Sequence, residues 1–203
     1  MSQLFESVSL GRITLANRVV MAPMTRSRAE DNDSVSDLHV RYYSQRATAG
    51  LIITEGTHPS KNAKGYCRTP GIYNQQQVAA WKKVVDAVHG QGGKIVLQLM
   101  HCGRVANAEN KAADAETIAP SAIQANEKIF TNKGMLPMDM PRALTTAEVA
   151  EVIDEYRQAT VYAFDAGFDG VELHCTSGYL PAQFLSTGTN KRDDQYGGSL
   201  ENR

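Results

Sequence analysis

Four short apolar segments, separated by longer stretches with helical features, constrain the fold of this chain more than anything else in its sequence. The segments span residues 19–24, 51–55, 94–100 and 170–174. Each is rich in branched side chains and apolar at successive positions, which is typical of strands buried on both faces. Strands that alternate with helices predict an α/β fold in which helices cover a parallel sheet.

Three of the intervening stretches predict amphipathic helices. The first starts near Ser36, carries Leu38 and Tyr42, and stops before Gly50. The second begins after a capping Asn74, with Gln77 at the reciprocal capping position. Its apolar face consists of Val78, Trp81, Val85 and Val88.

The third predicted helix is longer and has clearer ends. Thr145 and Glu148 form a capping box at its start, and Gly167 is a typical C-terminal stop. Its apolar stripe consists of Val149, Val152, Ile153, Tyr156 and Ala163.

Two stretches depart from this alternation. Residues 4–18 predict a small hairpin that turns near Gly11 and could plug one end of a barrel. Residues 104–140 have no clean period and contain several Pro and Gly, so we expect a long excursion after the third strand. Excursions of that length inside a compact domain are usually lids or binding segments.

Four βα units are half of a (β/α)₈ TIM barrel, which needs eight strands to remove its open edges. We therefore expect residues 1–203 to form a single domain that is the N-terminal half of such a barrel, with the C-terminal half missing. Residues 199–203 resemble the start of a helix, which fits that expectation.

Composition excludes several classes of function. The formal net charge of −1 gives no electrostatic reason to bind nucleic acid or an anionic membrane. No apolar run approaches the roughly 20 residues that span a bilayer, and the first residues lack the features of a signal peptide. Three scattered cysteines without C-x-x-C spacing indicate reduced thiols, a cytoplasmic location and no metal site.

The chemically active groups of such barrels project from the C-terminal ends of the strands. At these ends the sequence places Thr25, then Glu55 to Thr57, then Gln98 to His101, and finally His174 to Tyr179. Few of these side chains are charged, and many are neutral groups that can form hydrogen bonds. That chemistry suits a flat heteroaromatic cofactor and a neutral substrate.

A set of motifs in a fixed order resembles the Old Yellow Enzyme family, the FMN-dependent ene-reductases. The set comprises MAPMTRSRA at 21–29, YYxQRA at 42–47, ITEGT at 53–57, GY at 65–66, TPGIY at 69–73, QLxHxGR at 98–104, AGFDGVELH at 166–174, GYL at 178–180, QFL at 183–185, NKR at 190–192 and YGGSLENR at 196–203. The resemblance covers essentially the whole chain and implies FMN as cofactor, with NADPH or NADH as reductant.

The resemblance also implies which residues hold the flavin. Thr25 would bond the C4 carbonyl region, and Gln98 the pyrimidine edge. Arg203 would supply positive charge near N1 and the C2 carbonyl. The ring would be lined by backbone groups of Ala22, Pro23, Met24 and Gly56, with His174 also in contact.

For catalysis, the resemblance implies a ping-pong reduction of activated C=C bonds in enones, nitroalkenes or maleimides. His174 would bind and polarise the carbonyl or nitro group of the substrate. Hydride would pass from flavin N5 to the β-carbon, and Tyr179 would protonate the α-carbon. Tyr66 would shape the substrate pocket.

Three departures from the family pattern bear on these roles. Ser177 stands where the family usually has Asn or His, so the second donor to the substrate is shorter. Met100 replaces the usual Trp as a softer pocket wall. Strands five to eight, which supply the phosphate-binding backbone in this family, are absent.

Two alternatives stay open. The chain is either an enzyme or a non-catalytic half-barrel that is active only with a complementary C-terminal chain, or paired with another copy of itself. Among enzymes, another FMN barrel such as a dienoyl-reductase is the competing possibility.

Overall fold

The centre of the protein is a four-stranded parallel sheet. The computed structural model describes residues 3–203, and its main strands are β3 (Val20–Met21), β4 (Leu51–Ile53), β5 (Ile95–Leu99) and β10 (Gly170–Leu173). Their spatial order, β10-β5-β4-β3, follows the chain, and every neighbouring pair is parallel. This is the arrangement of four consecutive strands in the predicted barrel.

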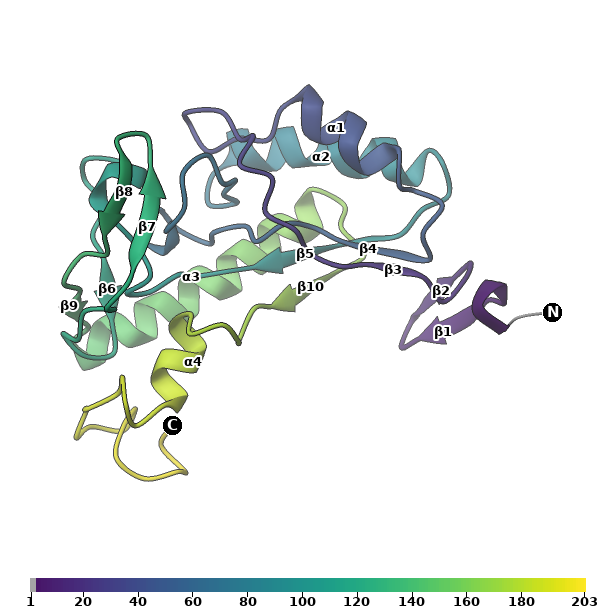
Figure 1. Ribbon diagram of the computed structural model, residues 1–203. Helices are drawn as coiled ribbons and strands as arrows, with labels where there is room; N and C mark the ends of the chain where they lie inside the picture. Colours follow the sequence, from purple (N-terminus) through teal and green to yellow (C-terminus); the bar gives the residue numbers. More distant parts are fainter. Residues whose placement is uncertain (1–2) are drawn as a thin grey trace.

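Helices cover one face of this sheet. They are α1 (Asp37–Ser44), α2 (Gln75–His89) and α3 (Thr146–Asp165), and a short α4 (Leu180–Leu185) follows the last strand (Figure 1). The largest core cluster lies between sheet and helices. It includes Ile52, Ile95, Leu97 and Leu99 from the strands, Tyr43 from α1, Trp81, Val84, Val85 and Val88 from α2, and Ala159 and Ala163 from α3.

The first helix forms where predicted, but its buried face was predicted wrongly. Leu38 is 61% exposed, whereas His39 and Tyr43 are buried. Both pairs of residues have the same spacing of four, so periodicity could not separate them. The Tyr43 hydroxyl decides the orientation, because it bonds the buried Glu55 at the end of β4.

Helices α2 and α3 form as predicted, except for one capping contact of α2 and one buried position of α3. The Asn74 side chain accepts from the Gln77 amide, but the Gln77 side chain accepts from the Tyr73 amide rather than completing a capping box. The capping box of Thr145 and Glu148 is confirmed. Ile153 of α3, predicted to lie on the apolar face, is 56% exposed, whereas Ala159, which was not predicted, is part of the core.

The other face of the sheet would be the inside of the barrel. The predicted hairpin is confirmed as β1 (Val8–Leu10) and β2 (Ile13–Leu15), with Gly11 in the left-handed region at φ 58°. Leu15 packs with Leu51 and Val96 of the inner face. The hairpin lies at the end of the sheet where the strands begin, which fits the predicted plug (Figure 1).

The excursion after β5 is more ordered than the sequence indicated. It holds β6 (Ile118–Ala119), β7 (Lys128–Thr131), β8 (Gly134–Pro137) and β9 (Arg142–Ala143), paired as β6-β9 and β7-β8. These strands lie beside the end of the sheet where the main strands finish (Figure 1). Two to four residues per strand are too few to give a readable period. Three single-turn 3-10 helices complete the described chain, at Gln3–Phe5, Lys61–Ala63 and Ala108–Asn110.

Both edge strands, β3 and β10, lack an outer neighbour among residues 3–203. The expectation that all four strands are buried on both faces is therefore wrong at the edges, where Val20 is 48% and Leu173 54% exposed. The predicted start of a helix at residues 199–203 is a turn instead. Within the described residues, no helix combines the length and apolarity needed to cross a bilayer.

Candidate functional site

The ends of β4 and β5 are joined by backbone bonds and by a close side-chain contact. The Thr57 amide donates to the Gln98 carbonyl (2.8 Å), and the Met100 amide donates to the Thr57 carbonyl (2.9 Å). A Cβ atom at Gly56 would lie 2.6 Å from Met100 Cε, so the glycine lets the buried Met100 side chain cross the end of β4. Gly56 and Met100 thus lie together, as the shared sheet edge predicts.

Gln98 is held from the next strand. The register places Glu172 of β10 directly beside Gln98 of β5, and Gln98 Nε2 donates to Glu172 Oε1 at 2.7 Å. No residue within 3–203 donates to the side-chain oxygen, Gln98 Oε1. Gln98 is 5% exposed, and its side chain keeps one acceptor available on the inner side of the sheet.

His174 begins a tight turn that folds Tyr179 back onto it. The His174 amide donates to the Leu99 carbonyl (2.9 Å), which fixes the start of the turn on β5. Ser177 and Gly178 have φ values of 57° and 73°, so the chain reverses in the left-handed region. The rings of His174 and Tyr179 are 4.7 Å apart at 83°, an edge-to-face contact.

Tyr66 closes the group from the loop after β4. Its hydroxyl lies 3.0 Å from that of Tyr179, and the two rings meet edge-on at 6.4 Å. The structure therefore brings together an imidazole and two phenols, 113 residues apart at the extremes, from the segments after β4 and β10, which lie on either side of β5.

Burial sets the protonation of these three groups. It lowers the pKa of His174, although the Glu172 charge acts in the opposite direction. Burial raises the pKa of Tyr66 and, together with the hydrogen bond between the two hydroxyls, the pKa of Tyr179. At neutral pH the site therefore combines a neutral imidazole with two protonated phenols, which can donate hydrogen bonds and protons.

The segment after β3 lies at the edge of the sheet opposite β10 and is largely exposed. Ala22, Met24 and Thr25 are exposed, and no side chain within 3–203 bonds the Thr25 hydroxyl. The adjacent Arg26 amide donates to Glu55 Oε2 at 3.0 Å. The segment is thereby fastened to the end of β4.

Glu55 is fully buried beneath this segment. Tyr43 donates to Glu55 Oε1 through its hydroxyl (3.3 Å), and His39 Nε2 lies 3.5 Å from the same oxygen. Burial raises the Glu55 pKa to about 7, partly offset by the hydrogen bonds from Arg26 and Tyr43. The carboxyl group therefore titrates near neutral pH instead of remaining a fixed charge.

Two predicted site residues are not brought into this group. Ser177 is exposed in the turn, and its hydroxyl faces that of Thr176 at 3.3 Å. The Arg203 guanidinium donates to the carbonyls of Leu185 (2.7 Å) and Ser199 (3.2 Å). It lines a groove between α3 and α4, and no contact within the described residues links it to Gln98 or His174.

Sequence reasoning missed Glu172 as a site residue and gave Glu55 no role beyond its position at a strand end. Both are carboxylates in otherwise apolar strand segments, which is a readable signal because an unpaired carboxylate is costly to bury. The sequence does not reveal the hydrogen-bond partners of these carboxylates, which are Gln98 for Glu172 and Tyr43 and Arg26 for Glu55.

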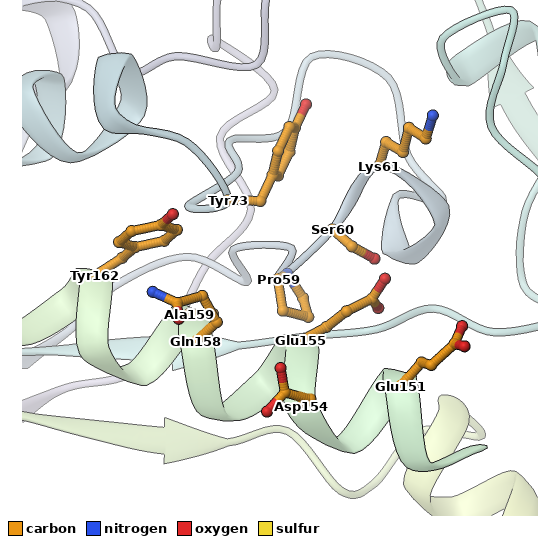
Figure 2. A pocket seen from close by; sticks show the side chains of 10 residues that line it. All are labelled: Pro59, Ser60, Lys61, Tyr73, Glu151, Asp154, Glu155, Gln158, Ala159 and Tyr162. Carbon is orange, nitrogen blue, oxygen red and sulfur yellow. The ribbon is translucent and has the colours of Figure 1, made fainter. Parts of the chain in front are cut away.

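A separate cavity of about 490 Å³ lies on the helix side of the sheet (Figure 2). Figure 2 shows its wall on α3, with the loop at residues 59–61 and Tyr73 opposite. None of the predicted site residues lines it. It is a feature of the outer layer and takes no part in the group at the strand ends.

No three His, Cys, Asp or Glu side chains within 3–203 are arranged to hold a metal ion. The strand ends offer an amide acceptor on β5, an imidazole and two phenols after β10 and β4, and an exposed hydroxyl after β3. This set can bind a flat hydrogen-bonding ring, polarise a carbonyl group and donate a proton.

Comparison with known proteins identifies a family of flavin-dependent oxidoreductases, which fits this set of side chains. Residues 3–203 match the profile of the NADH:flavin oxidoreductase / NADH oxidase family. The putative 12-oxophytodienoate reductase 4 of Oryza sativa subsp. japonica is 46% identical over 196 residues, which are 96% of this chain and 50% of that protein. The probable flavin mononucleotide-dependent alkene reductase of Leishmania infantum is 41% identical, over 96% of this chain and 54% of its own length.

Solved structures agree in fold. Morphinone reductase in complex with tetrahydroNAD superposes with a TM-score of 0.93 at 48% identity, covering 100% of this chain and 57% of that one. The Old Yellow Enzyme homologue from Zymomonas mobilis gives 0.94 at 41% identity, covering 99% of this chain and 56% of that one. The chain spans about half the length of the curated relatives it matches, and its sheet is the first half of their TIM barrel. It belongs to the NADH:flavin oxidoreductase / NADH oxidase family, that of the Old Yellow Enzymes.

Proposed function

We propose that this chain carries the substrate-activating half of an FMN-dependent ene-reductase that reduces activated C=C bonds with NADPH or NADH. The observation that carries the proposal is the contact of His174, Tyr179 and Tyr66 at the strand ends. The Leishmania relative, named as an alkene reductase, supports the reaction class.

The residues at the strand ends fit the ring of FMN. An isoalloxazine ring has an imide N–H between two carbonyl groups. The free Gln98 oxygen suits the N–H, and the unpartnered Thr25 hydroxyl suits a carbonyl. Ala22, Pro23, Met24 and Gly56 would contribute backbone groups beside the ring, and His174 would border it on the substrate side.

When bound, FMN would supply the hydride that it takes from the nicotinamide. The chain itself would bind and activate the substrate. His174 would hydrogen-bond a carbonyl or nitro oxygen and draw electron density from the conjugated double bond, an effect worth roughly 3 kcal/mol for one fixed donor. Tyr179, kept protonated by its raised pKa, would deliver a proton to the α-carbon.

The remaining pocket residues would shape specificity. Tyr66 would orient the Tyr179 hydroxyl through their 3.0 Å contact, and Met100 would form an adaptable wall. Ser177 would approach the substrate only if the turn after β10 rearranged. The flavin role of Arg203 stays a prediction, as does a cytoplasmic location, for which the support is that all three cysteines are free thiols.

The test is Tyr179→Phe in FMN-loaded protein. We expect unchanged flavin absorbance and unchanged reduction by NADPH, with alkene reduction slowed about 10²- to 10⁴-fold, since only the proton donor is lost. Tyr162→Phe removes a phenol from the cavity on the helix side and is the matched control. Equal alkene reduction by Tyr179→Phe and the control would contradict the assignment.

A second candidate is that the chain is a non-catalytic half-barrel, active only with a complementary C-terminal chain or a second copy. Within the described part of the chain the outer edges of β3 and β10 are unpaired, which favours it. Native mass spectrometry with an absorbance spectrum separates the two. A colourless 22.2 kDa species that gains flavin only with a second chain supports the half-barrel, and a flavin-bound monomer rejects it.

A further inference from the structure

Glu172 lies on the inner side of the sheet in direct contact with a predicted cofactor residue. The parallel register of β5 and β10 sets Gln98 beside Glu172, so both side chains point to the same face. The 2.7 Å bond from Gln98 Nε2 to Glu172 Oε1 joins residues 74 positions apart. No cationic side chain within 3–203 pairs with this carboxylate.

This contact fixes which end of the Gln98 amide faces the site. A carboxylate only accepts hydrogen bonds, so it holds the NH₂ group of Gln98 and turns the carbonyl oxygen away from itself. Gln98 is 95% buried between neighbouring strands, so the orientation is not averaged by free rotation. The site then presents an acceptor at this position and rejects a ligand atom that needs a donor.

We propose that Glu172 is a positioning residue that locks the Gln98 carboxamide as a hydrogen-bond acceptor for an imide-type N–H of the cofactor ring. The inference rests on the proposed flavin site. It adds the orientation of Gln98 and a negative charge beside the ring, which makes electron uptake by the cofactor less favourable.

The first measurement needs no cofactor. In ¹H–¹⁵N spectra of the chain, one Gln98 side-chain amide proton should be shifted downfield and protected from exchange with water, because it bonds a carboxylate. Glu172→Gln should abolish the shift, since two facing amides can pair in either orientation. Glu30→Gln, at an exposed site on the helix side, should leave it unchanged. A Gln98 amide that exchanges like a free one in the unsubstituted chain overturns the proposal, whether or not the variant folds.

The second measurement uses FMN-loaded protein. Glu172→Gln should weaken FMN binding about tenfold, the effect of about 1.4 kcal/mol, and raise the midpoint potential. FMN binding and potential equal to those of Glu30→Gln would overturn the proposal. If the unsubstituted chain binds no FMN, the proposed function fails for this chain, while the amide spectra still decide whether Glu172 orients Gln98.

Discussion

Glu55 is a carboxyl group enclosed by aromatic and backbone donors, and its charge is only partly compensated there. Burial raises its pKa to about 7, against 4.5 for an exposed glutamate. The folded chain therefore holds this proton over a pH range in which the unfolded chain has released it. The resulting stabilisation is full below about pH 4.5 and is lost as the pH rises through 7.

We accordingly expect the free energy of unfolding to fall between pH 5 and 8, by up to about 3 kcal/mol from this group. Glu55→Gln keeps an acceptor for Arg26 and Tyr43 but cannot ionise, so the fall should become shallower. Urea denaturation across this pH range measures it. A variant whose slope equals that of the unsubstituted chain would show that Glu55 does not titrate there.

At the scale of elements, the β1–β2 hairpin contributes apolar contacts to the inner face of the sheet. Leu15 is 3% exposed and packs on Leu51 and Val96. Leu15→Ala should lower the free energy of unfolding by about 2–4 kcal/mol, through lost burial and the cavity left behind. Leu10→Ala, at a site 53% exposed on the same hairpin, is the control and should cost little. Equal losses of stability for the two variants would mean that packing of Leu15 on the inner face does not stabilise the fold.

At the scale of the whole molecule, the sheet formed by residues 3–203 has two unpaired edges, and exposed edges template further pairing. We expect association that grows with protein concentration, measurable by sedimentation velocity. Val20→Lys places a charge on the exposed edge strand β3 and should reduce association, whereas Leu38→Lys on the outer side of α1 should not. A monomer at all concentrations would contradict this expectation.

The four parallel strands and the three long helices could be predicted from the sequence, because strand and helix periods and the rule for parallel strand ends are local or topological properties. It placed Gly56, Met100, Gln98 and His174 at one edge, where the structure has them. It did not reveal the contact of Gln98 with Glu172, since that contact depends on the register of strands far apart in sequence.

The buried face of α1 and the contacts of Arg203 could not be predicted from the sequence, for different physical reasons. The buried face of α1 is chosen by a hydrogen bond to Glu55, not by its hydrophobic period. The Arg203 guanidinium donates to the Ser199 carbonyl just before it and to the Leu185 carbonyl at the end of α4, and no sequence pattern indicates these contacts.

The alternation along β5 has a practical consequence for protein engineering. Leu97 and Leu99 face the helices, while Val96 and Gln98 face the inner side of the sheet. Substitutions at neighbouring residues of β5 therefore affect either the packing against the helices or the inner face. A mutant library confined to inward positions near the C-terminal ends of the strands, such as Gln98 and Glu172, would explore the predicted cofactor site without disturbing the cluster of Leu15, Leu51 and Val96. One directed at the outward positions would chiefly change heat tolerance.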